Sequence, residues 1–267
     1  MNIFITGMAG MIGFHTAKHL TAQGHTVTGI DNFNDYYEVS LKQERARILR
    51  EEHGVTTLPA DIISVDYDTV LEGVDVILHL AAYANPRHSL EYPQLYIDNN
   101  ITGTQRLIEG AERMGINNVV YASSSCVMHE QPLPWRESDH PGHQNNPYGW
   151  TKRANECQFI YSKIKNTMGL RFFTVYGPYG RPDMALFNFT KNILNNEPID
   201  LFNYGDMKRD FTFVDDIVQG ITLVINNCVV TGDVNVDRLP FFDIDFLFIF
   251  LRAKSIGESV EVNLTCN

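Results

Sequence analysis

Short runs of apolar residues alternate with longer amphipathic stretches along the first two thirds of the chain. The apolar runs have the length of buried strands, and the amphipathic stretches have the length and spacing of helices that bury one face. The pattern predicts strands at residues 2–6, 26–30, 56–60, 74–80, 118–122 and 168–175. It predicts helices at residues 11–23, 38–52, 93–114 and 147–165.

Strands that alternate with helices of this length are typical of βαβ units. We therefore expect an α/β protein, with a Rossmann-type doubly wound parallel sheet and helices on both of its faces. The alternation loosens after Gly177, where Pro178, Pro182 and Pro198 interrupt the pattern. A second, smaller region is expected there, with short strands flanking residues 206–213.

Charge and composition exclude several classes of function. The 267 residues include 21 Lys and Arg against 32 Asp and Glu, a net charge of −11. That charge repels phosphate backbones and anionic lipid, so we expect neither a nucleic-acid nor a membrane partner. The 4 cysteines lack paired spacing, and the N-terminus lacks a signal-peptide pattern, so reduced thiols and a cytoplasmic location are expected.

A glycine-rich turn joins the first predicted strand to the first predicted helix. Gly7, Gly10 and Gly13 allow a tight turn and a close approach of a pyrophosphate to the helix N-terminus. Asp31 ends the second strand, where a carboxylate binds ribose hydroxyls and repels a 2′-phosphate. The sequence therefore predicts NAD rather than NADP. Asp61, after the third strand, is a weaker candidate for the adenine end, with a simple turn as the alternative.

A tyrosine and a lysine lie one helical turn apart near the start of the predicted helix at residues 147–165. The i, i+4 spacing of Tyr148 and Lys152 places both side chains on one face. The lysine and a nicotinamide cation favour the phenolate, so that Tyr148 accepts a proton from a sugar hydroxyl. A serine run, Ser123 to Ser125, ends the fifth strand at the sheet edge that binds ligands in such folds. Each feature alone has a structural alternative, but their order along the chain favours a redox site.

At this point the sequence resembles the extended short-chain dehydrogenase/reductase family of NAD-dependent epimerases and dehydratases, over about residues 1–222. The general marks are the glycine turn, His79-Leu-Ala-Ala82, Asn100-Ile-Thr-Gly103, the serine run, and the Tyr148 and Lys152 pair. The more specific segments, residues 32–42, 169–185 and 209–216, are most similar to UDP-glucuronate 4-epimerases.

The resemblance implies a role for several residues by their position. It implies Ser124, Tyr148 and Lys152 as catalytic residues. It implies cofactor contacts at Gly7, Gly10, Met11, Ile12, Gly13, Asp31, Asn32, Asp61, Ile62, Leu80, Ala81, Ala82, Asn100, Ser123, Tyr148 and Lys152. It implies substrate contacts at Arg87, Ser124, Thr174, Arg181 and Arg209. Arg87 is a candidate for the sugar carboxylate, with a surface ion pair as the alternative. No metal ion is expected.

The implied activity is NAD-dependent epimerisation at C4 of a UDP-sugar, with UDP-glucuronate becoming UDP-galacturonate through a transient 4-keto sugar. The alternatives are another nucleotide-sugar epimerase, a dehydratase or decarboxylase of the same family, and a non-catalytic protein that binds NAD(H) and a sugar nucleotide. Ser125 and Cys126 stand where the dehydratases carry an Asp-Glu pair, which weighs against dehydration. The resemblance also implies polysaccharide biosynthesis and a homodimer formed through the helices at residues 93–114 and 147–165.

Two regions are expected along the chain. Residues 1–175 form an NAD-binding Rossmann domain, rejoined by about residues 206–228, and residues 176–267 form a substrate-binding cap. From about residue 229 the sequence departs from the family pattern and includes an apolar stretch at residues 239–251. The cap is therefore expected to be shortened, with an atypical tail.

Overall fold

The computed structural model of the chain describes residues 1–136, 139–206 and 208–230. A six-stranded sheet with the order β3-β2-β1-β4-β5-β6 forms its centre, and all neighbouring strands are parallel. Its strands are β1 (Asn2–Thr6), β2 (Thr26–Asp31), β3 (Thr57–Pro59), β4 (Val76–His79), β5 (Asn118–Ser124) and β6 (Asn166–Phe172). The doubly wound parallel sheet predicted from the sequence is confirmed.

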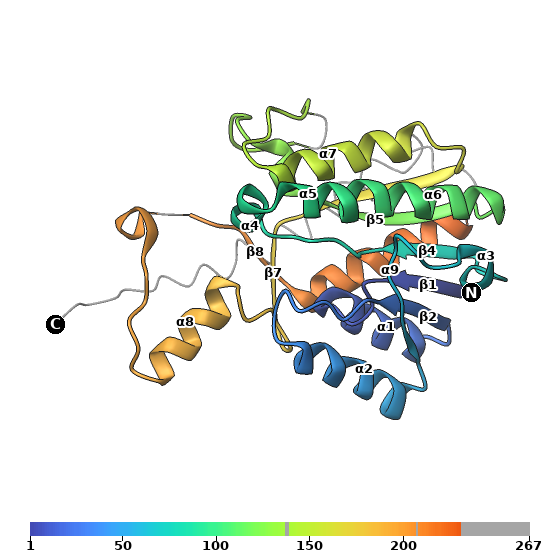
Figure 1. Cartoon of the computed structure of the whole chain (residues 1–267), viewed down its shortest axis with the longest axis horizontal. Coiled ribbons are helices and arrows are strands. Elements are labelled where there is room, and N and C mark those ends of the chain that lie inside the picture. Colours follow the sequence, from blue (N-terminus) through green and yellow to red (C-terminus); the bar gives the residue numbers. More distant parts are fainter. Residues whose placement is uncertain (137–138, 207, 231–267) are drawn as a thin grey trace.

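Helices cover both faces of this sheet (Figure 1). One face is covered by α1 (Met11–Ala22), α2 (Val39–His53) and α9 (Val214–Val230), and the other by α3 (Tyr67–Val70), α6 (Thr104–Arg113) and α7 (Pro147–Ile160). Successive strand residues point to opposite faces. Ile3 and Ile5 accordingly pack in the core with α1 and α9, whereas Phe4 packs in the core with α6 and α7.

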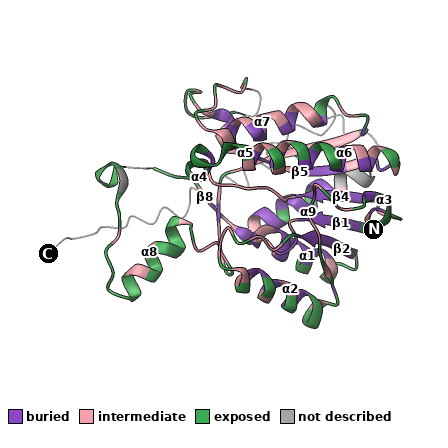
Figure 2. Cartoon of the chain, viewed as in Figure 1, coloured by how far each residue is buried: buried purple, intermediate pink, exposed green. Residues whose placement is uncertain are grey.

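The remaining elements lie around the carboxyl edge of the sheet or beyond it. Helices α4 (Pro86–Glu91) and α5 (Pro93–Tyr96) lead through a π-helical segment, Ile97–Gly103, into α6. Strands β7 (Thr174–Tyr176) and β8 (Phe211–Phe213) form a separate parallel pair. Helix α8 (Ala185–Leu194) has no buried residue and stands away from the sheet, whereas the buried core follows the strands (Figure 2).

The chain returns to the sheet after the segment that contains α8. Val214, Ile217 and Ile221 of α9 are buried in the same core as Phe14 and Ala17 of α1. The expected division into a Rossmann domain and a cap stays a prediction, and residues 231–267 of that cap lie outside the described residues. Within the described part of the chain, no helix is long and apolar enough to cross a membrane.

Two expected elements have different ends from those predicted. The single strand expected at residues 168–175 is wrong, because β6 ends at Phe172 and β7 pairs with β8 in another sheet. A mainly apolar stretch of this length does not show where a strand changes its partner. The helix expected to continue to residue 165 ends at Ile160, since Ser162 turns the chain by donating its hydroxyl to the carbonyl of Phe159. The helix expected at residues 93–114 is present, interrupted by the π-helical segment.

A buried histidine connects the two central strands to α6. His79 Nδ1 lies 2.7 Å from Thr6 Oγ1, and His79 Nε2 lies 2.9 Å from Thr104 Oγ1. The Thr6 oxygen already accepts from the N–H groups of Leu80 and Ala81, so its own proton is donated to Nδ1. The ring proton therefore lies on Nε2 and is donated to Thr104. Burial lowers the pKa of His79 to about 3, so the ring is neutral in the folded protein.

We predict that His79→Gln removes part of the acid sensitivity of the fold. The unfolded chain takes up a proton at the ordinary His pKa of 6.5, whereas folded His79 does so only near 3. The stability due to neutral His79 is thus complete above pH 6.5 and is lost as the pH falls toward 3. In that window, the unfolding free energy of the wild type should fall by up to about 1.4 kcal/mol per pH unit more than that of the variant. Urea unfolding of both proteins at about pH 7 and about pH 5.5 measures the difference. The same loss of unfolding free energy between the two pH values in both proteins would contradict the prediction.

Candidate active site

A cavity of about 360 Å³ opens at the carboxyl ends of the parallel strands. The strand order reverses between β1 and β4, which is where open α/β sheets bind ligands. Most of the residues singled out in the sequence line this cavity. They are Gly7, Gly10, Met11, Ile12, Gly13, Asp31, Asn32, Ile62, Leu80, Ala81, Ala82, Ser123, Ser124, Tyr148, Lys152, Thr174 and Arg181.

Two predicted cofactor residues lie behind the cavity wall and hold residues that line it. Asp61 accepts a hydrogen bond of 2.8 Å from the side-chain amide of Asn32. Asn100 is fully buried and exchanges two hydrogen bonds, of 2.9 and 3.0 Å, with the backbone of Tyr83. Both residues therefore position the wall, and a direct contact with the cofactor stays a prediction.

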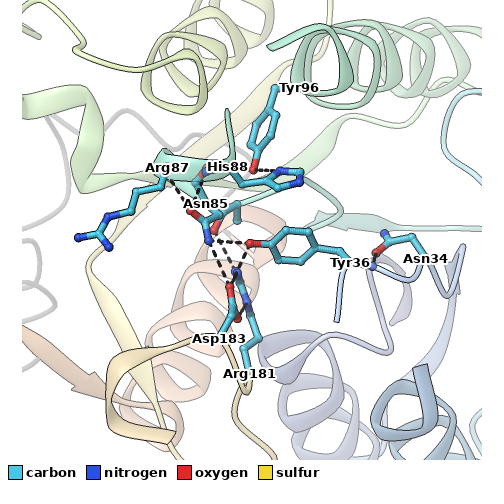
Figure 3. A network of polar contacts seen from close by, with 9 residues as sticks. Asn34, Tyr36, Asn85, Arg87, His88, Tyr96, Arg181 and Asp183 are labelled. Atoms are coloured by element: carbon cyan, nitrogen blue, oxygen red, sulfur yellow. Dashed lines mark hydrogen bonds and ion pairs between the residues drawn. The ribbon is translucent and has the colours of Figure 1, made fainter. Parts of the chain in front are cut away.

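Two arginines that were predicted to contact the substrate lie outside the lining of the cavity. Arg87 and Arg209 are exposed, and neither is among the residues that line it. The guanidinium of Arg87 extends away from Asp183 and Arg181 in Figure 3. Their roles in substrate binding stay predictions that this arrangement of the chain does not support.

The glycine turn has a shape that side chains would prevent. Gly7 has a left-handed backbone with φ of +71°, and a Cβ there would lie 2.9 Å from the backbone nitrogen of Ala81. A Cβ on Gly13 would overlap the carbonyl oxygen of Gly7. The turn therefore packs its bare backbone against the end of β4 and leaves the N-terminus of α1 open to the cavity.

Asp31 fixes this turn and also faces the cavity. Its carboxylate accepts hydrogen bonds from the backbone of Ala9, at 3.1 Å, and of Phe33, at 2.9 Å. Burial raises the pKa of Asp31, while these bonds and the charge of Lys42 lower it, and the rise prevails. Lys42 lines the same end of the cavity and donates to the backbone oxygen of Asn34 at 2.7 Å.

A fully buried arginine supports the turn from behind, and sequence reasoning missed it. Arg45 of α2 donates to the backbone oxygens of Ala9 and Tyr179, at 2.8 and 2.5 Å, and to the hydroxyl of Tyr37 at 2.7 Å. It therefore joins the glycine turn to the segment that follows β7. The helical pattern gave no signal, because an arginine between Glu44 and other charged residues is typical of a solvated helix face.

The candidate catalytic residues meet at the ends of β5 and α7. Tyr148 is buried close to Ser124; burial raises the pKa of Tyr148 to about 12, and its interaction with the Ser124 side chain lowers it. Lys152 donates to the backbone oxygen of Ala122 at 2.9 Å, and burial lowers the pKa of Lys152 to about 8. In the protein alone, burial thus raises the pKa of Tyr148. The lower pKa expected from the sequence assumed that a nicotinamide cation also lies in the site.

Ser123, predicted as a cofactor contact, is bound to a buried ionic group. Its hydroxyl donates to Glu156 of α7 at 2.7 Å. Glu156 also accepts from Arg171 at 2.8 Å and from Arg153 at 2.9 Å. Since Glu156 lies one turn beyond Lys152, this group fixes the end of β5 against the face of α7 that carries Lys152.

The side chain of Arg181 enters the cavity with its orientation already fixed. It makes two hydrogen bonds to Asp183, at 3.0 and 2.6 Å, and donates to the carbonyl of Ala84 at 3.0 Å. Tyr36 donates to Asp183 at 3.1 Å, and Asn85 donates to Tyr36 at 2.6 Å (Figure 3). Burial raises the pKa of Asp183, but the hydrogen bonds and the charge of Arg181 lower it by more. The net pKa lies below the ordinary value, so the pair is ionised.

Comparisons with known proteins identify the family. The model of the "NAD dependent epimerase/dehydratase family" matches residues 3–237. The chain belongs to this family. Protein CapI of Staphylococcus aureus is 46% identical over 234 residues, which are 84% of this chain and 69% of that protein. A probable UDP-glucuronate 4-epimerase of Rhizobium meliloti is 41% identical over 228 residues, 83% of this chain and 67% of that protein.

Solved structures of family members have the same fold. The UDP-glucuronic acid 4-epimerase from Bacillus cereus, in complex with UDP-glucuronic acid and NAD, has a TM-score of 0.80 and 33% identity. The match covers 86% of this chain and 76% of that one. MoeE5, in complex with UDP-glucuronic acid and NAD, has a TM-score of 0.74 and 31% identity, covering 84% of this chain and 72% of that one.

We predict that Arg45→Met lowers the unfolding free energy by about 2–3 kcal/mol, because it leaves the buried carbonyl of Ala9, the partly buried carbonyl of Tyr179 and the phenol of Tyr37 without their donor. Urea unfolding measures the change. The matched control is Arg47→Met on the same helix, since Arg47 is exposed and its ion pairs with Glu44 and Glu51 contribute little. Equal midpoints for the two variants would contradict the supporting role of Arg45.

Proposed function

We propose that this chain is an NAD-dependent epimerase that inverts C4 of UDP-glucuronate to give UDP-galacturonate. The observation that carries the proposal is the convergence of Ser124, Tyr148 and Lys152 with the glycine turn and Asp31 on one cavity. Family membership and the relatives named for this reaction support it. The Bacillus cereus relative was solved with both UDP-glucuronic acid and NAD.

The residues along the cavity suit NAD. The open N-terminus of α1 at Gly10 presents free N–H groups and a positive helix end to a pyrophosphate. Asp31 offers its carboxylate to the adenine ribose, and Lys152 and the Leu80–Ala82 backbone flank the other end. When bound, NAD supplies reversible hydride chemistry at the sugar C4 carbon.

Proton transfer is the work of the chain itself. Tyr148 accepts the proton of the C4 hydroxyl while hydride leaves that carbon, and it returns the proton after hydride is delivered to the opposite face. Ser124, which interacts with Tyr148, holds the reacting oxygen beside it. The Lys152 ammonium stabilises the phenolate that Tyr148 becomes once the proton is released. The reaction consumes no net hydride and no net proton.

Arg181 and Thr174 are the substrate contacts that the cavity supports. Both line it, and the planar guanidinium of Arg181 suits a diphosphate or a carboxylate. Dehydration is not proposed, because Ser125 and Cys126 follow Ser124 into a 3₁₀ turn and neither supplies the acid that elimination of water needs.

The reaction is tested with UDP-glucuronate, NAD and the purified chain, with proton NMR of the anomeric region as the readout. UDP-galacturonate signals are expected from the wild type. Tyr148→Phe should lose about 10²–10⁴-fold in kcat, because the proton acceptor is removed. Tyr92→Phe is the control, since Tyr92 is exposed and lies outside the cavity lining. An unchanged spectrum with the wild type, or full activity in Tyr148→Phe, would overturn the proposal.

We also infer that two copies associate through the outer faces of α6 and α7. Exposed Ile160 and Tyr161 stand at the end of α7, at 65% and 87% exposure, next to a groove between the two helices. Light scattering after size exclusion should give twice the chain mass for the wild type. It should give the single mass for Ile160→Asp, because a carboxylate in an apolar interface is costly. A monomeric wild type would refute the dimer.

A further inference from the structure

Helix α4 contacts the backbone of the candidate catalytic tyrosine. Ser89 of α4 is fully buried, and its hydroxyl accepts a hydrogen bond of 3.1 Å from the N–H group of Tyr148. The same hydroxyl donates to the carbonyl of Pro86, at the start of α4, at 2.6 Å. Both bonding directions of the Ser89 hydroxyl are therefore in use, and the start of α7 is joined to α4 at the residue proposed to move the proton.

The other end of α4 is joined to the ion pair on the substrate side. The side-chain oxygen of Asn85 caps α4 by accepting from the N–H groups of Arg87 and His88, at 2.9 and 3.2 Å. Its amide nitrogen donates to the hydroxyl of Tyr36 at 2.6 Å and to Asp183 at 3.3 Å (Figure 3). One side chain thus begins the helix and also holds the carboxylate that orients Arg181.

A buried tyrosine makes a second connection between the same two places. The hydroxyl of Tyr96 donates to the backbone oxygen of Asn85 at 2.9 Å and lies 3.2 Å from His88 Nδ1. Its ring lies edge-on to the ring of Tyr148, with the centroids 6.3 Å apart. The first turn of α4 and the phenol of Tyr148 therefore contact the same side chain.

We propose that Asn85, Ser89 and Tyr96 are positioning residues, which make α4 a rigid connection between Arg181 on the substrate side and Tyr148 at the reacting carbon. The inference rests on the proposed function, which assigns the roles of Arg181 and Tyr148. None of the three positioning residues lines the cavity, so each acts through another residue. A six-residue helix is not stable alone, and these bonds hold it in place. A substrate that repositions Arg181 or Asp183 then repositions Tyr148 as well.

Kinetics of three variants test the connection. Ser89→Ala removes the acceptor of the Tyr148 N–H group and should lower kcat about tenfold, with KM for UDP-glucuronate changed less than about twofold. Asn85→Ser keeps a helix-capping oxygen but loses the amide donors, so it should raise KM and also lower kcat. Because the two residues act through one helix, the effects on kcat/KM in the double variant should be non-additive.

The matched control is Leu90→Ala, on the same helix, since Leu90 is 62% exposed and takes no part in these bonds. Its kinetic constants should equal those of the wild type. Equal losses in Leu90→Ala and Ser89→Ala, or additive effects in the double variant, would overturn the proposal, because either result indicates independent structural damage.

Amide hydrogen exchange on the full chain gives a readout that does not need turnover. Ser89→Ala should speed exchange at the start of α7, around Tyr148, and Leu90→Ala should not. Tyr96→Phe, which keeps the ring and loses only the bond to Asn85, is the second variant if Ser89→Ala does not fold, and a smaller change of the same sign is expected. If the folded variants have the same amide exchange rates and the same kcat as the wild type, the proposed connection is wrong. Faster exchange together with an inactive wild type would instead refute the proposed function and support the connection.

Discussion

The close contact between the glycine turn and the end of β4 is the constraint on which the rest of the site depends. Gly7 lies against the backbone of Ala81 with no room for a Cβ, and Thr6 accepts from the N–H groups of Leu80 and Ala81 while donating to His79. The two central strands therefore end at the same level, and the cavity opens where their connections diverge. A larger residue in the turn would separate the strand ends and displace both walls of the cavity.

The charges in this site have a different balance from those of the whole chain. The net charge is −11, yet the side chains of Lys42, Lys152 and Arg181 line the cavity. Lys42 and Lys152 are held by backbone oxygens, whereas Arg181 is paired with Asp183. A buried cation held by dipoles keeps its full charge for an incoming anion, and one held by a carboxylate does not. Under the proposed function, Lys152, and Lys42 beside Asp31, would attract the dinucleotide, whereas Asp183 already fixes the orientation of Arg181.

The sequence predicted the sheet well because short apolar runs and helical patterns report burial directly. Gly7, Asp31 and Tyr148 follow from motif order. Patterns along the chain do not report which partner a residue meets. Phe172 and Phe173 belong to one apolar run, yet the sheet ends between them and β7 pairs elsewhere. Arg45, Asn85 and Ser89 were missed for the same reason, since each acquires its role through contacts with residues distant in the sequence. Arg87 was a candidate from its place in the loop after β4; the fold leaves it exposed, and its role in substrate binding stays a prediction.

Burial of Tyr148 has a consequence for the order of events at the site. With the pKa of Tyr148 near 12 and that of Lys152 near 8, the protein alone holds a neutral phenol and an ammonium in the lining of one cavity at neutral pH. A neutral phenol is a poor base, so the site gains basicity only when further positive charge enters the same low-dielectric space. A nicotinamide cation has that charge, and a reduced nicotinamide does not. Under the proposed function, Tyr148 would be the stronger base with the oxidised cofactor and the weaker base with the reduced one. The same burial that raises the pKa of Tyr148 would then couple proton transfer to the redox state of the cofactor.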